Sequence, residues 1–414
     1  TDGGVVAVDT ALTHLTDAVW LGKSRGLWIW GVPGGERPII DGGSIGFGCM
    51  VIASRIQSGA PAVTVVSNLV FQHCGNGGHR TTPADSLSTN SGVVTANGGA
   101  ILANGTGITV TDVVIRWCGC QLNGGGIALT NSDYNLVMRT SVYHTRAGVF
   151  GGGIAVDAAH VTIQDVNVTS CVGYQGGGGM FVGMATLDLQ RGTPLVDTLV
   201  SKAIVAASGM RVTNNTAVVG HGGGWLVSGH PTQTGARSGG RIAVSYPPFV
   251  QVGRGVVFTN NSALRANGGG IAATDRAVVA GVGLPIQHIV GAVFDSNAAV
   301  SGGAVYGTSG ATIVCQGCNF TRNMAVASWF AQAPDKPAVG VTASTAGWGG
   351  HALVDSKCSW TCNGCIFAEG VATGGSGGAM AMLNKAFVVL SHCSIHRNRA
   401  DDLGGGVVVS ELGS

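Results

Sequence analysis

The chain has 414 residues and a formal net charge of +2, and 71 of its residues are glycine. Charged residues make up 10% of the chain and hydrophobic residues 45%, whereas ordinary globular proteins carry about 25% charged residues. These values exclude a disordered polyelectrolyte, a coiled coil and a protein that binds nucleic acid through a basic field. No run of about 18 apolar residues occurs, so we expect no membrane-spanning helix in this segment.

The first 60 residues read as short strands joined by turns. Residues 27–31 (LWIWG) and 37–42 (RPIIDG) combine apolar, β-favouring side chains with turn residues. We expect residues 1–60 to form N-terminal coils of a repeat that becomes regular over residues 61–410.

From residue 61 onward a large apolar residue, called the anchor below, recurs along the chain. Its shortest spacings are 27 (115 to 142), 26 (142 to 168), 26 (294 to 320) and 28 residues (367 to 395). Longer spacings are interpreted as this period plus an insertion. A period of about 20 to 50 residues indicates a solenoid. The anchors are Phe71, Ile115, Val142, Val168, Val212, Phe258, Phe294, Phe320, Phe367 and Ile395.

Two features accompany the anchors. The residue two positions earlier is apolar in most repeats, which is the period of a strand with one buried face. A glycine cluster such as Gly268-Gly269-Gly270 follows later in each repeat. Strands that stack on the equivalent strand of the next repeat must be parallel to it. The sequence therefore predicts an all-β protein, a right-handed parallel β-helix with about 27 residues per coil and roughly 10 to 13 coils.

We predict one β-helix domain over residues 1–414, with loop insertions at about 79–96, 181–209, 226–255, 272–290 and 324–347. The final strand pattern at 407–410 follows a glycine cluster with no capping segment. An uncapped β-helix end exposes unpaired strand edges. We therefore expect the chain to belong to a longer one, or to meet another subunit end to end or laterally.

The repeat units, for example Gly-Gly-Ala-Val at 302–305 and Phe-Asp-Ser-Asn at 294–297, resemble those of polymorphic outer membrane proteins and related surface adhesins. More broadly, the pattern over about residues 38–410 is similar to the right-handed β-helix of the pectin lyase-like superfamily. The resemblance implies the fold. It does not by itself assign an activity, because this fold hosts enzymes, adhesins and structural rods alike.

Three residues after the anchor, asparagine recurs in consecutive coils. Stacked asparagines can form an amide ladder that satisfies backbone groups at a tight corner. We predict such a structural ladder from Asn215, Asn261, Asn297 and Asn323. Other residues occupy this position elsewhere, namely Cys74, Cys118, Thr145, Cys171 and Gly370.

Eleven cysteines are present, and several share a column of the repeat. Stacked residues have Cα atoms about 4.8 Å apart, within disulfide range. The candidate pairs are Cys74 with Cys118, Cys315 with Cys362, and Cys318 with Cys365. Buried thiols are the alternative. Two Cys-x-x-Cys units, 315–318 and 362–365, also have the spacing of a zinc site, but we predict no metal or cofactor.

Asp112, Arg139 and Asp165 share a column three residues before the anchor, where side chains should face outward. A polysaccharide lyase could use such a ladder as the catalytic set and to hold Ca²⁺. The alternative is an alternating-charge ladder that stabilises one face of a sheet.

Five Asn-x-Ser/Thr sequons are glycosylation candidates: Asn104, Asn167, Asn214, Asn260 and Asn319. Together with the cysteines they favour an extracellular or cell-surface location. Trp329, Phe330 and Trp348 bound the last long insertion and are candidates for partner contact.

The sequence favours a non-enzymatic role: a structural or adhesive β-helix that presents loops to other surface or matrix proteins, or to glycans. No nucleic-acid partner is expected. The alternative is a carbohydrate-active enzyme, a polysaccharide lyase or glycoside hydrolase of the pectin lyase-like fold.

Overall fold

The computed structural model describes residues 4–8, 13–14, 19–22, 27–32, 36–43, 48–53, 63–75, 97–183, 203–229, 248–274, 278–279, 289–328 and 346–410. Within these ranges every regular element is a β-strand. Among the described residues there is no helix of the length and hydrophobicity needed to cross a membrane.

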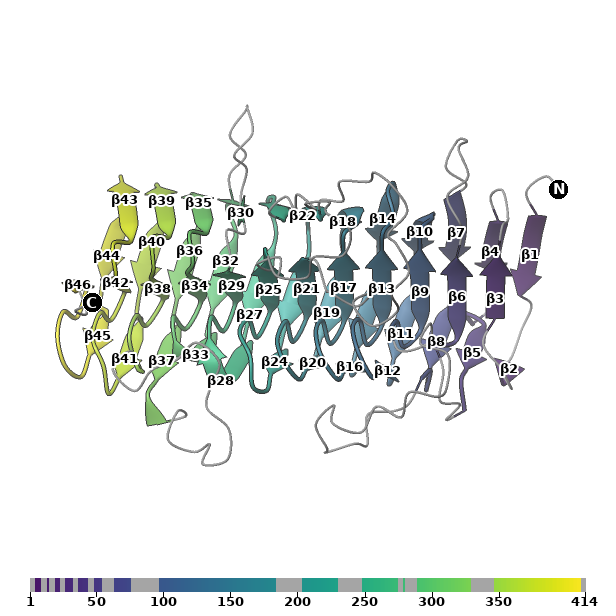
Figure 1. The fold of residues 1–414 in the computed structure, drawn as a ribbon, viewed down its shortest axis with the longest axis horizontal. Helices are drawn as coiled ribbons and strands as arrows, with labels where there is room; N and C mark the ends of the chain where they lie inside the picture. Colours follow the sequence, from purple (N-terminus) through teal and green to yellow (C-terminus); the bar gives the residue numbers. More distant parts are fainter. Residues whose placement is uncertain are drawn as a thin grey trace, which may run out of the picture.

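The described strands wind into twelve coils that stack along one axis, from β1 at one end to β46 at the other (Figure 1). The strands belong to four sheets, which we call A, B, D and C in the order that the chain meets them. From the fourth coil on, each coil contributes one described strand to each sheet, except that the ninth contributes both β30 and β31 to sheet A. All strand pairs within the sheets are parallel, as in β10 with β14 and β11 with β15. The predicted all-β parallel β-helix is therefore confirmed.

Sheet A contains β1 (Gly4–Val8), β4 (Leu27–Gly31), β7 (Val63–Ser67), β10 (Gly107–Thr111), β14 (Asn135–Met138), β18 (His160–Gln164), β22 (Ile204–Ser208), β26 (Phe249–Val252), β30 (Val278–Val279), β31 (Ile289–Val290), β35 (Thr312–Gln316), β39 (Ser359–Asn363) and β43 (Phe387–Ser391). Sheet B contains β2 (Thr13–His14), β5 (Ile39–Asp41), β8 (Val70–Gln72), β11 (Val114–Arg116), β15 (Ser141–Tyr143), β19 (Asn167–Thr169), β23 (Arg211–Thr213), β27 (Val257–Thr259), β32 (Val293–Asp295), β36 (Asn319–Thr321), β40 (Ile366–Ala368) and β44 (Ser394–His396).

Sheet D begins in the fourth coil and contains β12 (Gly119–Cys120), β16 (Arg146–Ala147), β20 (Val172–Gly173), β24 (Thr216–Ala217), β28 (Ser262–Asn267), β33 (Ala298–Ser301), β37 (Met324–Val326), β41 (Val371–Thr373) and β45 (Arg399–Ala400). Sheet C contains β3 (Val19–Gly22), β6 (Met50–Ala53), β9 (Ile101–Asn104), β13 (Ile127–Thr130), β17 (Ile154–Asp157), β21 (Met180–Gly183), β25 (Trp225–Ser228), β29 (Ile271–Thr274), β34 (Val305–Gly307), β38 (Ala352–Val354), β42 (Met380–Leu383) and β46 (Val407–Ser410).

The anchors lie in sheet B and point into the rod. Each strand is short because only its central residue faces inward, as in β11, where Ile115 is buried between the half-buried Val114 and Arg116. Four phenylalanine anchors in consecutive coils stack almost face to face, with ring centroids 4.8, 4.8 and 4.7 Å apart. This spacing equals the distance of about 4.8 Å between neighbouring strands. The stack comprises Phe258, Phe294, Phe320 and Phe367.

The glycine clusters form the corner that leads into sheet C. Gly151 has a φ of +68°, which L side chains rarely adopt. A Cβ atom on the next residue, Gly152, would lie 2.3 Å from the carbonyl oxygen of Gly178 in the following coil. The corner therefore needs glycine both for its turn and for the close approach of successive coils.

The predicted insertions largely lie outside the described residues, including all of 79–96, so their boundaries stay predictions. The interior is one continuous apolar cluster running from Leu27 to Val407. A second cluster lies on the outer face of sheet C, where Phe181, Leu226 and Tyr306 are buried. Side chains of both faces of sheet C are thus removed from solvent.

Candidate functional site

Six polar and aromatic residues gather on the outer face of sheet B and at its edge, across coils two to five. We call Asp41, Gln72, His73, Arg116, Trp117 and Tyr143 the Arg116 patch. Asp41 is the register partner of Gln72, Gln72 of Arg116, and Arg116 of Tyr143. These four side chains point outward because each follows a core-facing residue of β5, β8, β11 or β15. Strand pairing alone therefore brings together residues up to about a hundred positions apart, 41 and 143.

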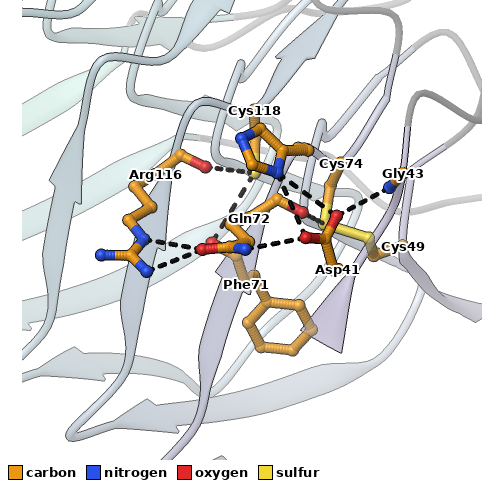
Figure 2. A network of polar contacts seen from close by, with 9 residues as sticks. Asp41, Gly43, Cys49, Phe71, Gln72, Cys74, Arg116 and Cys118 are labelled. Atoms are coloured by element: carbon orange, nitrogen blue, oxygen red, sulfur yellow. Dashed lines mark hydrogen bonds and ion pairs between the residues drawn. A yellow bond between two sulfur atoms is a disulfide. The ribbon is translucent and has the colours of Figure 1, made fainter. Parts of the chain in front are cut away.

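Hydrogen bonds connect the patch from coil to coil. The Gln72 amide nitrogen donates to Asp41 Oδ2 at 2.7 Å. The Gln72 amide oxygen in turn accepts from Nε and Nη2 of Arg116 at 2.9 and 2.7 Å (Figure 2). Arg116 Nη1 lies 3.5 Å from the Tyr143 hydroxyl. Because Asp41 fixes the direction of the Gln72 amide, it also fixes the orientation of the guanidinium.

Asp41 is the buried anion of the patch, with only 6% of its surface exposed. Burial raises the pKa of this carboxyl, but hydrogen bonds from Gln72, the Gly43 backbone and His73 outweigh burial and hold the pKa below its usual value of 3.8. Its two oxygens lie 3.3 Å from His73 Nδ1. Asp41 is therefore charged at neutral pH. The half-buried guanidinium of Arg116 contacts the side-chain amide of Gln72 and the phenol of Tyr143.

Aromatic rings surround the guanidinium. Arg116 Cζ lies 4.7 Å from the centroid of the Trp117 ring, and the His73 ring stacks on Trp117 at 5.4 Å with an interplanar angle of 11°. Tyr143 meets Trp117 edge-on at 6.5 Å, and His144 in turn lies edge-on to Tyr143. Trp117 keeps 45% of its surface exposed. The patch thus combines a half-exposed indole ring with a positioned cation.

Backbone geometry does not account for these aromatic residues. His73, Trp117 and His144 all have φ between 51° and 54°, because the corner after sheet B turns through the left-handed region in every coil from the third onward. Asn214, Arg322 and Glu369 occupy the same corner in later coils with similar φ values. The corner therefore accepts side chains of several kinds, and its backbone does not require an aromatic ring there.

Sequence reasoning missed the Arg116 patch. A detectable signal was present: the positions immediately after the anchors are Gln72, Arg116 and Tyr143, and the next positions are His73, Trp117 and His144. Reading these two columns down consecutive coils would have placed the residues side by side. Asp41 lies in a coil before the first predicted anchor, Phe71, so it belonged to none of the predicted columns of the repeat.

The proposed lyase set lies on the corner between sheets A and B, apart from the aromatic residues. Arg139 donates from Nε and Nη2 to both oxygens of Asp112, at 2.9 and 2.8 Å. The Arg139 hydrogen bond lowers the pKa of Asp112. Asp165 is exposed in the next coil and influences Arg139 through charge alone. Asp112 and Arg139 therefore neutralise each other's charge. A catalytic role for Asp112, Arg139 and Asp165 stays a prediction.

The cysteine pairing predicted for Cys74 is wrong. Cys74 bonds to Cys49 of the preceding coil, with Cα atoms 5.3 Å apart, and Cys118 is a buried thiol. The column argument failed because Cys49, which directly precedes β6, and Cys74, which follows β8, occupy different positions of the repeat although their Cα atoms are adjacent. The other two predicted pairs are thiols. Cys315 and Cys362 are register partners on β35 and β39. Cys318 and Cys365 each directly precede a register partner, on β36 and β40.

No three His, Cys, Asp or Glu side chains of the described residues are arranged to hold a metal ion. The zinc arrangement considered for Cys315, Cys318, Cys362 and Cys365 thus has no support in the geometry of those four side chains. Burial raises the pKa of the Cys315 and Cys362 thiols well above the ordinary value.

The asparagine column forms a continuous hydrogen-bonded ladder. Asn215 donates from its side chain to Asn261 Oδ1 at 3.0 Å, Asn261 to Asn297 at 2.9 Å, and Asn297 to Asn323 at 3.0 Å. Each Oδ1 also accepts the backbone N–H of the preceding asparagine. All four residues are fully buried. The ladder satisfies backbone groups at this corner and leaves no amide facing solvent, which makes it structural.

The glycosylation candidates differ in exposure. Asn167, Asn214 and Asn260 are exposed, whereas Asn104 and Asn319 are half-buried. The side-chain oxygen of Asn319 is buried without a hydrogen-bond partner. Among the candidates for partner contact, Trp348 packs partly against the apolar cluster on sheet C, and Trp329 and Phe330 lie outside the described residues.

Comparisons of the chain with known protein families, with characterised protein sequences and with solved structures find no match.

Proposed function

We propose that this protein is an extracellular β-helix that serves as a structural or adhesive rod at a cell surface and binds a glycan at the Arg116 patch. The observation that carries the proposal is the contact between Arg116 and Trp117. The guanidinium is held by Gln72, which in turn is bonded to Asp41, and lies 4.7 Å from the centroid of an exposed indole ring.

Sugars suit this surface for two reasons. Their C–H faces pack on exposed aromatic rings, and Trp117 and His73 provide adjoining rings close to the surface. Their hydroxyl or acidic groups accept hydrogen bonds, and an arginine with a fixed orientation supplies several donors in one plane. Because Asp41 and Gln72 pre-position the guanidinium, little conformational entropy is lost on binding.

The remaining features support the same assignment. The glycine-cluster and Phe-x-x-Asn repeats favour membership of the pectin lyase-like superfamily, with surface adhesins as the nearer resemblance. The Cys49–Cys74 disulfide and the exposed sequons at Asn167, Asn214 and Asn260 fit an oxidising, extracellular setting. Long continuous parallel sheets make a rigid support for the patch and for loops that contact other surface or matrix proteins.

Binding to an array of neutral and acidic glycans tests the proposal, with Trp117→Ala as the key variant. We expect wild-type protein to retain a defined subset of glycans and Trp117→Ala to bind at least about tenfold more weakly, equal to about 1.4 kcal/mol. Tyr134→Ala is the matched control, because Tyr134 is exposed, has a similar left-handed φ and lies outside the patch. Equal binding by wild type and Trp117→Ala, or no retained glycan, would reject the proposal.

A carbohydrate-active enzyme is the second candidate, and one observation favours it. His73, next to the charged Asp41, and Tyr143 flank Arg116, and imidazole and phenol groups can transfer protons while an arginine neutralises an acidic substrate. Incubation of retained glycans with the protein, with and without Ca²⁺, distinguishes the two functions. Unsaturated or newly reducing sugar products that disappear in His73→Ala would establish catalysis, and intact glycans would leave binding alone.

A further inference from the structure

The outer face of sheet A differs from the other faces of the rod in its charge. The described strands of sheet A contain no aspartate, glutamate, lysine or arginine. The outer faces of sheets B and D carry charged side chains, for example Arg116, Arg211 and Arg146. The outer face of sheet C is largely buried. Within the described residues, sheet A therefore alone combines an uncharged outer face with exposure to solvent.

Large apolar side chains stand on this face. Trp28 and Trp30 of β4 expose 58% and 36% of their surface. β4 is paired on both sides, with β1 and β7, so these rings face the side of the rod and not its end. Leu136 and Met138 of β14 are half-buried on the same face. An uncharged face with exposed tryptophans marks an interaction site.

Side-chain size changes along the face. Two outward columns run in register through coils two to seven, which contribute β4, β7, β10, β14, β18 and β22. Each column begins with a tryptophan and ends with a small residue. The first column is Trp28, Val65, Thr109, Leu136, Thr162 and Ala206. The second column is Trp30, Ser67, Thr111, Met138, Gln164 and Ser208.

We propose that sheet A is the interface of a two-fold symmetric dimer of this chain, in which two rods pack face to face and run in opposite directions. Sheets that pack in this way lie about 10 Å apart, with their facing side chains in contact. A two-fold axis along the strands, between coils four and five, places coil two of one copy over coil seven of its partner. The inference does not depend on glycan binding, because the Arg116 patch lies on and beside sheet B.

This arrangement matches large side chains with small ones, as a closely packed interface requires. In the first column the facing pairs are Trp28 with Ala206, Val65 with Thr162, and Leu136 with Thr109. The second column repeats this pattern at its ends and at its centre. Rods that ran in the same direction would instead place tryptophan on tryptophan and leave a gap at Ala206.

Charged groups at the rim fit the same pairing. Asp112 and Arg139 stand at the corner between sheets A and B, in coils four and five, which face each other across the axis. Each aspartate is therefore near the partner's arginine as well as its own. His160 and Asp133 form a second pair at the opposite edge, with Nδ1 and Oδ1 3.1 Å apart. An apolar centre with a polar rim is the usual anatomy of a protein interface.

The interface is small, so the dimer should be weak. Coils two to seven span about 24 Å along the rod, at the usual spacing of neighbouring strands. Interfaces that bury less than about 1,200 Å² belong to transient complexes. We expect a monomer–dimer equilibrium with a Kd of about 1 to 100 μM.

Sedimentation velocity over a range of protein concentrations tests the dimer. Thr162→Arg places a charge at an exposed position that faces Val65 of the partner, and it should raise the Kd at least about tenfold. Asn363→Arg is the matched control, because Asn363 is exposed on the same face but lies in coil eleven, beyond the contact. This control should dimerise like wild type. Urea midpoints close to that of wild type will show that both variants fold.

A second substitution tests the orientation of the rods. Adding Val65→Glu to Thr162→Arg puts opposite charges on facing positions, so the double variant should return to a Kd near that of wild type. Val65 and Thr162 are three coils apart within one chain, which prevents an ion pair inside a single copy. A Kd of Thr162→Arg equal to that of wild type would overturn the proposal, as would a double variant that recovers nothing. Wild-type protein that stays monomeric would also overturn it, and binding of that monomer to phosphatidylcholine vesicles would assign the face to a lipid surface instead.

Discussion

The imidazole of His351 occupies the space that an asparagine side chain would fill at Gly370. A Cβ atom added to Gly370 would lie 2.5 Å from His351 Nε2. His351 comes from the glycine-cluster corner of coil ten, yet its Nδ1 lies 3.0 Å from Asn323 Nδ2 and its Nε2 lies 3.0 Å from Asn398 Oδ1. The histidine therefore carries the asparagine ladder across the one late coil in which the asparagine is missing.

This relationship also defines the protonation state of His351. Asn323 Nδ2 donates to Nδ1, so the ring proton is on Nε2 and is donated to Asn398 Oδ1. The ring is fully buried, and burial lowers the pKa of His351 to about 4. A neutral histidine is thus a part of the ladder.

Removing the imidazole should destabilise the C-terminal coils, and restoring an asparagine should recover part of the loss. His351→Ala leaves the Asn323 amide and the Asn398 oxygen without their partner, which we expect to cost about 2 to 4 kcal/mol. Adding Gly370→Asn to His351→Ala restores a ladder amide. Recovery should be partial, because a Cβ at residue 370 also approaches the Gly378 carbonyl oxygen at 2.5 Å.

Urea denaturation of the wild type, both single variants and the double variant measures this coupling. Gly370→Asn alone should be destabilising, since its side chain collides with His351. Additive effects of the two substitutions would show that they do not share one space.

Stability should decrease as the pH falls from about 6.5 to about 4. In this range the unfolded chain binds a proton at His351 and the folded chain does not, so each unit of pH costs about 1.4 kcal/mol and the whole range about 3 kcal/mol. Urea midpoints measured at several pH values check this. In His351→Gln the free energy of unfolding should depend less steeply on pH in this range, and only the contribution of the carboxylates should remain. An unchanged pH dependence would contradict a neutral, buried His351.

Interrupting the asparagine ladder in its middle should be costly. Asn297→Ala removes the acceptor of both the backbone and side-chain N–H groups of Asn261, and the donor to Asn323. We expect a loss of about 3 kcal/mol, because the groups left behind are buried. Asn167→Ala is the control: this asparagine is exposed, and its loss should change the free energy of unfolding by no more than about 0.5 kcal/mol. Similar midpoints for both variants would show that the ladder contributes little.

The phenylalanine stack should be the most sensitive part of the core. Phe294 contacts Phe258 and Phe320 face to face and is fully buried, so Phe294→Ala should cost about 3 to 5 kcal/mol. Phe387→Ala, at a ring that is 63% exposed, should cost about 0.5 kcal/mol or less. Thermal and urea unfolding measure both, and a small effect at Phe294 would mean that neighbouring coils relax into the cavity.

Periodicity made the core of the fold predictable. The anchors Phe71, Phe258 and Phe367, for example, recur with one apolar residue two positions before them, and a side chain in a strand has only two faces from which to choose. Parallel pairing then followed from the repeat itself. The asparagine column could be read in the same way, because each member makes the same contacts to the coil next to it.

Features that break the repeat depended on the tertiary structure. The Cys49–Cys74 bond, the reach of His351 into the space above Gly370, and the contact between Asp41 and His73 each join residues from different columns. A sequence shows which residues are stacked, because stacking preserves position within the repeat. It does not show how far a corner residue can extend across the coil, since that distance is set by backbone turns and by the space that neighbouring side chains leave.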